Sequence, residues 1–251
     1  MTHRVLDLDL DFFVFPTAHF RSGRLRLPEP QYSCSRPEEV ERFLEQQCGL
    51  SKSRKIPGRL CVDHDEAFDT WKEWIAKGEI EAPFDVDHVD AHADLGLGDS
   101  SWVYLLTEIL ALPVEERGQP KRGSGGLNFG SYLAFALANR WIRSLNYVYG
   151  PDTPLLDGFP SDIHTIFFRD EDWKNNPIEL PHYSEAQMNA ILMCQKQDPL
   201  DREPPIPNCY VAGTEFQRSG FTHMILARSP GYTPSTADSL IPIIQQYFYS
   251  I

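Results

Sequence analysis

Two segments of this chain alternate acidic or histidine residues with small or apolar ones. Residues 89–95 read Val-Asp-Ala-His-Ala-Asp-Leu, which places Asp90, His92 and Asp94 at every second position. In an extended strand, such residues point to one face. Burying two carboxylates and an imidazole without partners is costly, and a divalent cation would offset that cost. The segment therefore predicts a strand whose end binds a metal ion.

The N-terminus repeats this alternation. Residues 6–13 read Leu-Asp-Leu-Asp-Leu-Asp-Phe-Phe, so Asp7, Asp9 and Asp11 share one face and the leucines share the other. A third polar group follows the short apolar strand that we expect over 59–62, and it reads Asp63-His64-Asp65-Glu66. Each of the three groups therefore lies at the end of a predicted strand.

Apolar strands alternate with amphipathic segments along most of the chain. We expect strands over 5–13, 59–62, 84–90, 146–149, 163–168, 209–213 and 223–227, and helices over 35–49, 67–77, 100–112, 128–142, 185–195 and 234–249. This order indicates an α/β fold, a three-layer α/β/α sandwich with a mostly parallel sheet. The length of 251 residues and the lack of a clear linker favour one domain over 1–251.

In open parallel sheets, functional groups gather at the carboxyl ends of the strands. We therefore expect the three polar groups to meet in one site. Oxygen and imidazole ligands without thiolates suit manganese, iron or zinc better than calcium. Taken singly, each group has a plainer explanation as a helix cap, a surface turn or a structural histidine. Together they favour a metal centre, with enough carboxylates to bridge two ions.

The composition narrows the class of partner. A net charge of −13 argues against nucleic acid, and it either favours a cationic substrate or serves only to solubilise the surface. No apolar run reaches about 18 residues and no signal peptide opens the chain, so we expect no membrane span. The five cysteines are scattered without a CxxC pair, which indicates free thiols in a reducing, cytoplasmic compartment.

The three polar groups resemble motifs of the arginase and agmatinase ureohydrolases. Val-Asp-Ala-His-Ala-Asp matches their D-A-H-x-D signature, Asp63-His64 resembles their G-G-D-H segment, and the N-terminal aspartates resemble their D-x-D strand. In that superfamily the D-x-D strand follows the D-A-H-x-D strand, whereas here it comes first. The resemblance therefore implies an arginase-like fold with a rearranged strand order.

This order resembles the peptide arginases more specifically. The supporting segments are the N-terminal aspartates, Val-Asp-His-Asp-Glu-Ala at 62–67 and Ile-Leu-Ala-Arg-Ser-Pro-Gly-Tyr-Thr-Pro at 225–234. Peptide arginases are atypical arginases of ribosomal-peptide pathways. They convert arginine side chains of a precursor peptide to ornithine and release urea. The resemblance covers most of the chain through short motifs, and it implies an arginine-containing precursor peptide as the partner.

The resemblance also implies two manganese ions and a set of ligands. In the mechanism that the resemblance implies, a metal-bridging hydroxide attacks the guanidinium carbon, and Asp94 passes the proton to the leaving amine. Asp90 and one N-terminal aspartate bridge the ions, and Asp7 is the alternative to Asp11 in the N-terminal pair. The implied metal ligands are Asp9, Asp11, His64, Asp90, His92 and Asp94.

The chain departs from the ureohydrolases where they bind the guanidinium group. Their late glutamate would fall near Ala227, and their histidine after the D-A-H-x-D strand has no counterpart in 95–130. A guanidinium group needs a carboxylate to position it. The candidates are Asp65, Glu66 and Glu215, although each of them also fits a surface or helix-capping role. We predict Glu66 as the catalytic partner of Asp94.

For three residues near these motifs, the sequence supports only a general expectation of their role. His88 is expected to pack beside the ligands rather than bind metal, and His164 to be a core histidine. Arg228 is expected to pair with a ligand carboxylate or with a peptide carbonyl.

Two other functions stay open. The first is a different amidohydrolase of the same fold, either agmatinase-like on a small guanidine or a deacetylase-like zinc enzyme. The second is a metal-stabilised peptide-binding protein without turnover. An exposed sheet edge could bind a leader segment by strand addition, and a homo-oligomer is possible.

Overall fold

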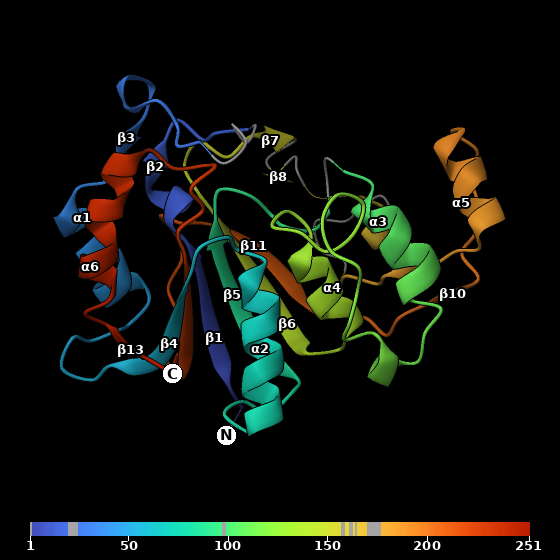
Figure 1. The fold of residues 1–251 in the computed structure, drawn as a ribbon, viewed down its shortest axis with the longest axis horizontal. Helices are drawn as coiled ribbons and strands as arrows, with labels where there is room; N and C mark the ends of the chain where they lie inside the picture. The colour runs from blue at the N-terminus through green and yellow to red at the C-terminus, as the bar shows by residue number, and fades with distance from the viewer. Residues whose placement is uncertain are drawn as a thin grey trace.

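The computed structural model describes residues 2–19, 25–96, 99–156, 159–160, 163, 165–169 and 177–251. Its centre is a seven-stranded sheet in the order β11-β6-β5-β1-β12-β4-β13, and every neighbouring pair is parallel (Figure 1). The strands are β1 Arg4–Asp9, β4 Ile56–Cys61, β5 Phe84–Asp90, β6 Ile142–Tyr149, β11 Asn208–Ala212, β12 His223–Ala227 and β13 Phe248–Ser250.

Three short antiparallel pairs lie outside the main sheet. They are β2 Val14–Phe15 with β3 Ser33–Cys34, β7 Leu155–Leu156 with β8 Phe159–Pro160, and β9 Pro181–His182 with β10 Asp201–Arg202. The α-helices are α1 Pro37–Arg42, α2 Glu66–Lys77, α3 Ser101–Tyr104, α4 Tyr132–Ala138, α5 Glu185–Leu192 and α6 Ile241–Ile244. Two of them continue as π-helices, α1 through Phe43–Gln47 and α3 through Leu105–Ile109.

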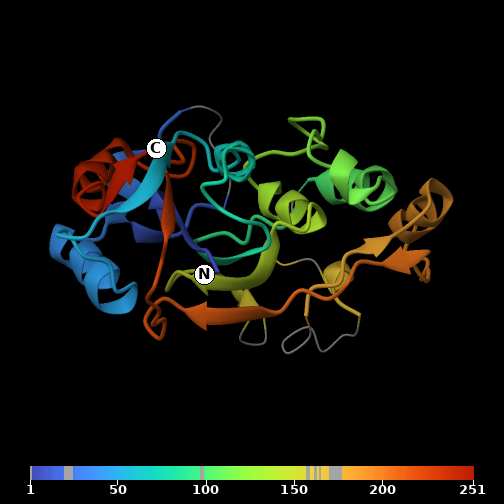
Figure 2. The same cartoon turned by 90° about the horizontal axis from the view of Figure 1, so that it is seen from below.

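Helices cover both faces of the sheet. Leu6 and Leu8 of β1 pack on the side of α1 and α6, in one apolar cluster. Val5 of the same strand packs on the side of α2 and α4, in a second cluster with Trp71 and Leu133. Figure 2 shows the two helix groups on opposite sides of the strands. The predicted three-layer α/β/α architecture is therefore confirmed.

Alternation along β1 also decides where its acidic residues lie. Because Leu6 and Leu8 face α1 and α6, Asp7 and Asp9 face the opposite layer, toward α2 and α4. The neighbouring strand β5 is in register with β1, with Asp7 opposite His88. The polar residues of both strands therefore share one side of the sheet.

Several predicted elements end earlier or take another form. The strand expected over 5–13 stops at Asp9 and continues as a 3-10 helix over Leu10–Phe13, because the Asp9 carboxylate accepts the Asp11 backbone N–H at 2.9 Å. Strand β6 begins at Ile142, where the sequence predicted the end of a helix. The strand expected over 163–168 was wrong, since Thr165–Phe167 is a 3-10 helix. His164 lies outside the described residues.

The C-terminal segment differs most from its prediction. Instead of one helix over 234–249, it forms a 3-10 helix over Ser235–Leu240, the short α6, and then β13. Pro242 sits in the first turn of α6, where its missing N–H costs least. Strand β13 pairs with β4 and closes that edge of the sheet. Among the described helices, none has the length and apolarity to cross a membrane.

Candidate metal centre

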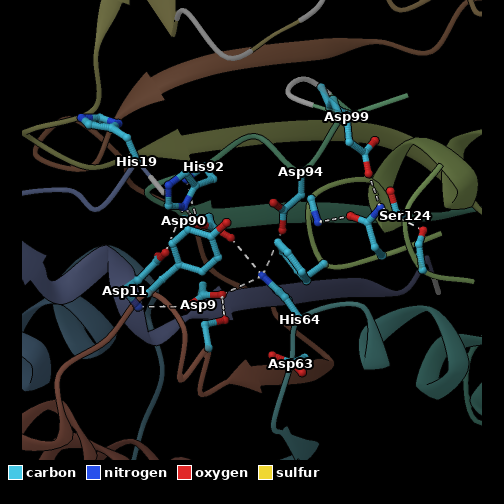
Figure 3. Close-up of a pocket in the computed structure, with 17 residues that line it drawn as sticks. Asp9, Asp11, His19, Asp63, His64, Asp90, His92, Asp94, Asp99 and Ser124 are labelled. Atoms are coloured by element: carbon cyan, nitrogen blue, oxygen red, sulfur yellow. Dashed lines mark hydrogen bonds and ion pairs between the residues drawn. The ribbon is translucent and has the colours of Figure 1, made fainter. Parts of the chain in front are cut away.

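Four adjacent strands bring the polar groups together. In the order β5-β1-β12-β4, all strands are parallel, so their carboxyl ends meet at one edge. Asp9 ends β1 and Asp90 ends β5, while His64 follows β4 and Ser229 follows β12. The three groups predicted from the sequence therefore converge at one place, although they are far apart in the chain (Figure 3).

His64 is the centre of the first half of the site. Its side chain is buried, and its Nδ1 lies 3.0 Å from an oxygen of Asp9, 2.9 Å from one of Asp90 and 3.3 Å from one of Asp94. One imidazole nitrogen thus faces three carboxylates from three different segments. Such a donor set, with one nitrogen and several oxygens, is suited to a divalent transition metal.

His92 and Asp11 form the second half. The Asp11 carboxylate lies 3.0 Å from His92 Nδ1, and the same nitrogen is 3.7 Å from Asp90. His92 Nε2 donates to the Ala18 carbonyl at 2.8 Å. A hydrogen bond on the far nitrogen fixes the tautomer and leaves Nδ1 directed at the carboxylates, as is usual for metal-binding histidines.

The ligand atoms are close enough to surround an ion. In the groups Asp9–His64–Asp90 and Asp11–Asp90–His92, all donor atoms lie within 4.8 Å of one another, and Asp90 belongs to both. A further group joins Asp90 and Asp94 to His88. The buried aspartates and histidines can therefore hold a metal ion, and the two halves share one carboxylate.

The electrostatics show why a cation fits. Burial and the charge of Asp90 raise the pKa of Asp94 to about 7. Burial, with Asp9 and Asp90 nearby, raises the pKa of Asp11 well above its usual value. Burial lowers the pKa of His92, but the Asp11 carboxylate outweighs it and the net shift is well upward. The cluster holds more carboxylates than imidazoles, so it takes up positive charge as protons or as a metal ion.

Asp7 contacts the other ring nitrogen of His64, Nε2, and its carboxylate accepts three hydrogen bonds. It is fully buried, and it accepts hydrogen bonds from His64 Nε2 at 3.2 Å, His88 Nδ1 at 3.0 Å and the Tyr132 hydroxyl at 2.6 Å. Burial raises the pKa of Asp7, but the charge of His64 and the hydrogen bonds from His64 and His88 hold it well below its usual range. Asp7 therefore orients two imidazoles. Sequence reasoning missed Tyr132, which no motif marks.

Backbone conformation helps to place two of these side chains. Asp94 has φ 50° and Ser229 has φ 45°, in the left-handed region that side-chain-bearing residues seldom adopt. Each turns the chain just beyond a strand end. The Ser229 hydroxyl donates to the Asp9 carboxylate. Local strain of this kind is typical of functional sites.

A cavity of about 620 Å³ opens beside the cluster. The ligand candidates line one part of its wall, and Asp63, Asp99, Phe129 and Tyr232 line another. The sequence did not single out Asp99, which lies in the loop before α3, because loop positions carry no periodic signal.

The predicted guanidinium-binding carboxylates lie elsewhere. Asp65 pairs with Arg122 at 2.9 Å, and Glu66 and Glu215 are exposed. None of the three is among the described residues that line the cavity. Arg228 pairs with Asp238 rather than with a ligand carboxylate. The structure thus gathers the six predicted metal ligands and leaves Glu66 outside.

Comparisons with known proteins identify no family. No family model matches the sequence, and neither the curated proteins nor the solved structures contain a significant match. The likeness to the peptide arginases therefore depends on the motifs alone.

Proposed function

We propose that this protein is a manganese-dependent hydrolase that converts arginine side chains of a precursor peptide to ornithine and urea. The observation that supports it most is the sharing of Asp90 between the two donor groups Asp9–His64–Asp90 and Asp11–Asp90–His92. A shared carboxylate is what a two-ion site needs to bridge its metals. Two manganese ions in such a site would lower the pKa of a shared water enough for it to attack a guanidinium carbon near neutral pH.

The residues divide into two ion-binding sets. Asp94 and His64 would bind one ion and Asp11 and His92 the other, with Asp9 and Asp90 between them. All six donors are oxygen or imidazole nitrogen, which suits manganese.

Asp94 is the residue that we assign to proton transfer. It is 9% exposed, whereas Asp9, Asp11 and Asp90 are 4% exposed or less. Asp94 is therefore the ligand carboxylate that best reaches a substrate in the cavity. It would accept a proton from the attacking water and donate it to the nitrogen of the breaking C–N bond, which leaves as the ornithine amine.

The direct test is urea release from an arginine-containing peptide, with manganese supplied and with the metal removed. We expect urea only with manganese, and we expect Asp90→Ala and His92→Ala each to abolish both urea release and bound manganese, measured by elemental analysis. Glu79→Gln removes an exposed charge at the end of α2 and serves as the control. Retained metal and retained activity in both alanine variants would contradict the proposal.

Urea also separates this function from the alternatives. Conversion of a guanidine to an amine and removal of an acetyl group both lower the peptide mass by about 42 Da, so mass alone does not distinguish them. Acetate release would indicate the deacetylase-like enzyme. Urea from agmatine but not from peptides would indicate a small-guanidine hydrolase. Peptide binding without any product would indicate a binding protein.

A further inference from the structure

The segment that carries three of the proposed ligands leaves the sheet directly after β5. Asp90 is the last residue of β5 and pairs with Tyr149 of β6, so the sheet itself holds Asp90 in place. His92 and Asp94 lie beyond the strand, and Asp94 turns the chain with φ 50°. Other contacts must therefore fix the direction in which these two side chains point.

The backbone of Ala91 and His92 has a partner at each of its four polar groups. The Ala91 N–H donates to the Asp11 carboxylate at 3.3 Å, and the His92 N–H donates to the Asp90 carboxylate at 2.8 Å. Both acceptors are proposed metal ligands, so these two contacts belong to the ion-binding cluster itself. The two carbonyl groups are held from outside that cluster.

The carbonyl groups of Ala91 and His92 accept hydrogen bonds from two buried side chains. The Thr153 hydroxyl, in the turn after β6, donates to the Ala91 carbonyl at 3.2 Å, and His88 Nε2 donates to the His92 carbonyl at 3.0 Å. Thr153 is 5% exposed and His88 is fully buried, so water does not compete for these carbonyls. The two carbonyls belong to the peptide planes on either side of the His92 α-carbon. Fixing both planes fixes the direction of the His92 side chain.

The contacts of the His88 ring make it a donor to this segment rather than a metal ligand. Its Nδ1 hydrogen-bonds to the Asp7 carboxylate at 3.0 Å, which holds the ring from the side opposite to the His92 carbonyl. Its Nε2 also lies 3.5 Å from the Asp90 carboxylate, and His88 is close enough to Asp90 and Asp94 to share an ion with them. A carbonyl oxygen only accepts hydrogen bonds, however, so Nε2 carries a proton and has no free electron pair for a metal ion.

We propose that Thr153 and His88 are positioning residues that clamp the Ala91 and His92 carbonyls and so direct His92 at its metal ion. This role rests on the proposed function and deepens it, because it concerns the ion bound by Asp11 and His92, here called the second ion. The first ion is bound by His64, which follows β4 and has no contact with the clamp. Losing the clamp should therefore weaken binding of the second ion more than binding of the first.

Two matched pairs of variants test the clamp. His88→Gln keeps an N–H donor at the position of Nε2, toward the His92 carbonyl, whereas His88→Asn keeps a donor only at the position of Nδ1, toward Asp7. Thr153→Ser keeps the hydroxyl, whereas Thr153→Val replaces it with a methyl group of similar size. In each pair, one variant retains the hydrogen bond to the carbonyl and the other loses it.

Manganese affinity is measured by titration calorimetry, and electron paramagnetic resonance distinguishes a magnetically coupled pair of ions from a single ion. We expect the affinity for the second ion to fall by about 10- to 100-fold in His88→Asn and by about 2- to 10-fold in Thr153→Val. The coupled signal should weaken accordingly at limiting manganese, while the affinity for the first ion should change by less than about 2-fold. His88→Gln and Thr153→Ser should stay close to the wild type.

Wild-type affinity for the second ion in folded His88→Asn and in Thr153→Val would overturn the proposed clamp. An equal loss in both members of a pair would also overturn it, because the hydrogen bond to the carbonyl would then not matter. If His88→Asn does not fold, the Thr153 pair decides.

Urea release is measured in parallel. Loss of the second ion in the clamp variants, with no urea from the wild type, would refute the hydrolase and leave the clamp standing. Urea from the wild type, with the second ion unaffected in the variants, would do the reverse. A wild type that binds fewer than two manganese ions would overturn both.

Discussion

The buried carboxylate of Asp7 offers the sharpest test of how the site is held together. Its oxygens accept hydrogen bonds from His64, His88 and Tyr132, and it is fully buried. Asp7→Asn keeps the size of the side chain, but it leaves one acceptor oxygen and directs an NH₂ group at the remaining donors. At least one charged histidine then loses its partner.

The expected cost follows from those contacts. Hydrogen bonds to charged groups contribute about 1.5–3 kcal/mol each, and breaking a buried ion pair costs about 3–5 kcal/mol. We therefore expect Asp7→Asn to lower the free energy of unfolding by about 3–5 kcal/mol. Tyr132→Phe removes one hydrogen bond to the charged Asp7 carboxylate, so it should cost about 1.5–3 kcal/mol. Because Asp7 also orients His64, manganese affinity should fall by about 10- to 100-fold in Asp7→Asn.

Two measurements separate these effects. Urea denaturation with EDTA present gives the stability of the metal-free protein, and titration calorimetry gives the manganese affinity. Glu79→Gln controls for the loss of one negative charge. If Asp7→Asn matched the wild type in both measurements, the view that Asp7 holds the histidines in place would be wrong.

Three further predictions follow from other parts of the structure. Manganese affinity should fall as the pH is lowered from about 8 to 6, because the pKa values of His64 and His92 are raised and protons compete with the metal. Calorimetry at several pH values measures this affinity. An affinity that does not change with pH would argue against His64 and His92 as ligands. Burial lowers the pKa of His223 to about 4, so the folded protein holds this residue neutral while the unfolded chain protonates it near 6.5. Stability from this source should be complete above about pH 6.5 and should decrease by up to about 3 kcal/mol as the pH falls to 4, and His223→Gln should lessen that decrease in denaturation experiments. Leu8→Ala, at a fully buried position in the face toward α1 and α6, should cost about 2–5 kcal/mol of unfolding free energy, and a loss below about 1 kcal/mol would contradict the described packing.

The sequence predicted best those elements whose own pattern decides their structure. Strands β5 and β12 have the expected bounds because every residue of each strand is buried. The convergence of Asp9, His64 and Asp90 was also predictable, since parallel strands end at one edge. Strand β13 was not, because its three residues become a strand only by pairing with β4. Asp99 and Tyr132 were not predicted for the same reason, since tertiary packing alone brings them to the site.

The position of β1 between β5 and β12 has a consequence for folding. Asp9 and Ser229, which touch through their side chains, are 220 residues apart in sequence. The middle of the sheet cannot close until nearly all of the chain has been synthesised, and contacts of such long range slow folding. Intermediates that lack β12 should expose the edges of β1 and β4 and be prone to aggregate. Because His64 follows β4 and reaches Asp9 and Asp90 only when β12 joins β4 to β1, the complete set of candidate ligands forms last, and a metal ion bound by the whole set would stabilise only the completed sheet.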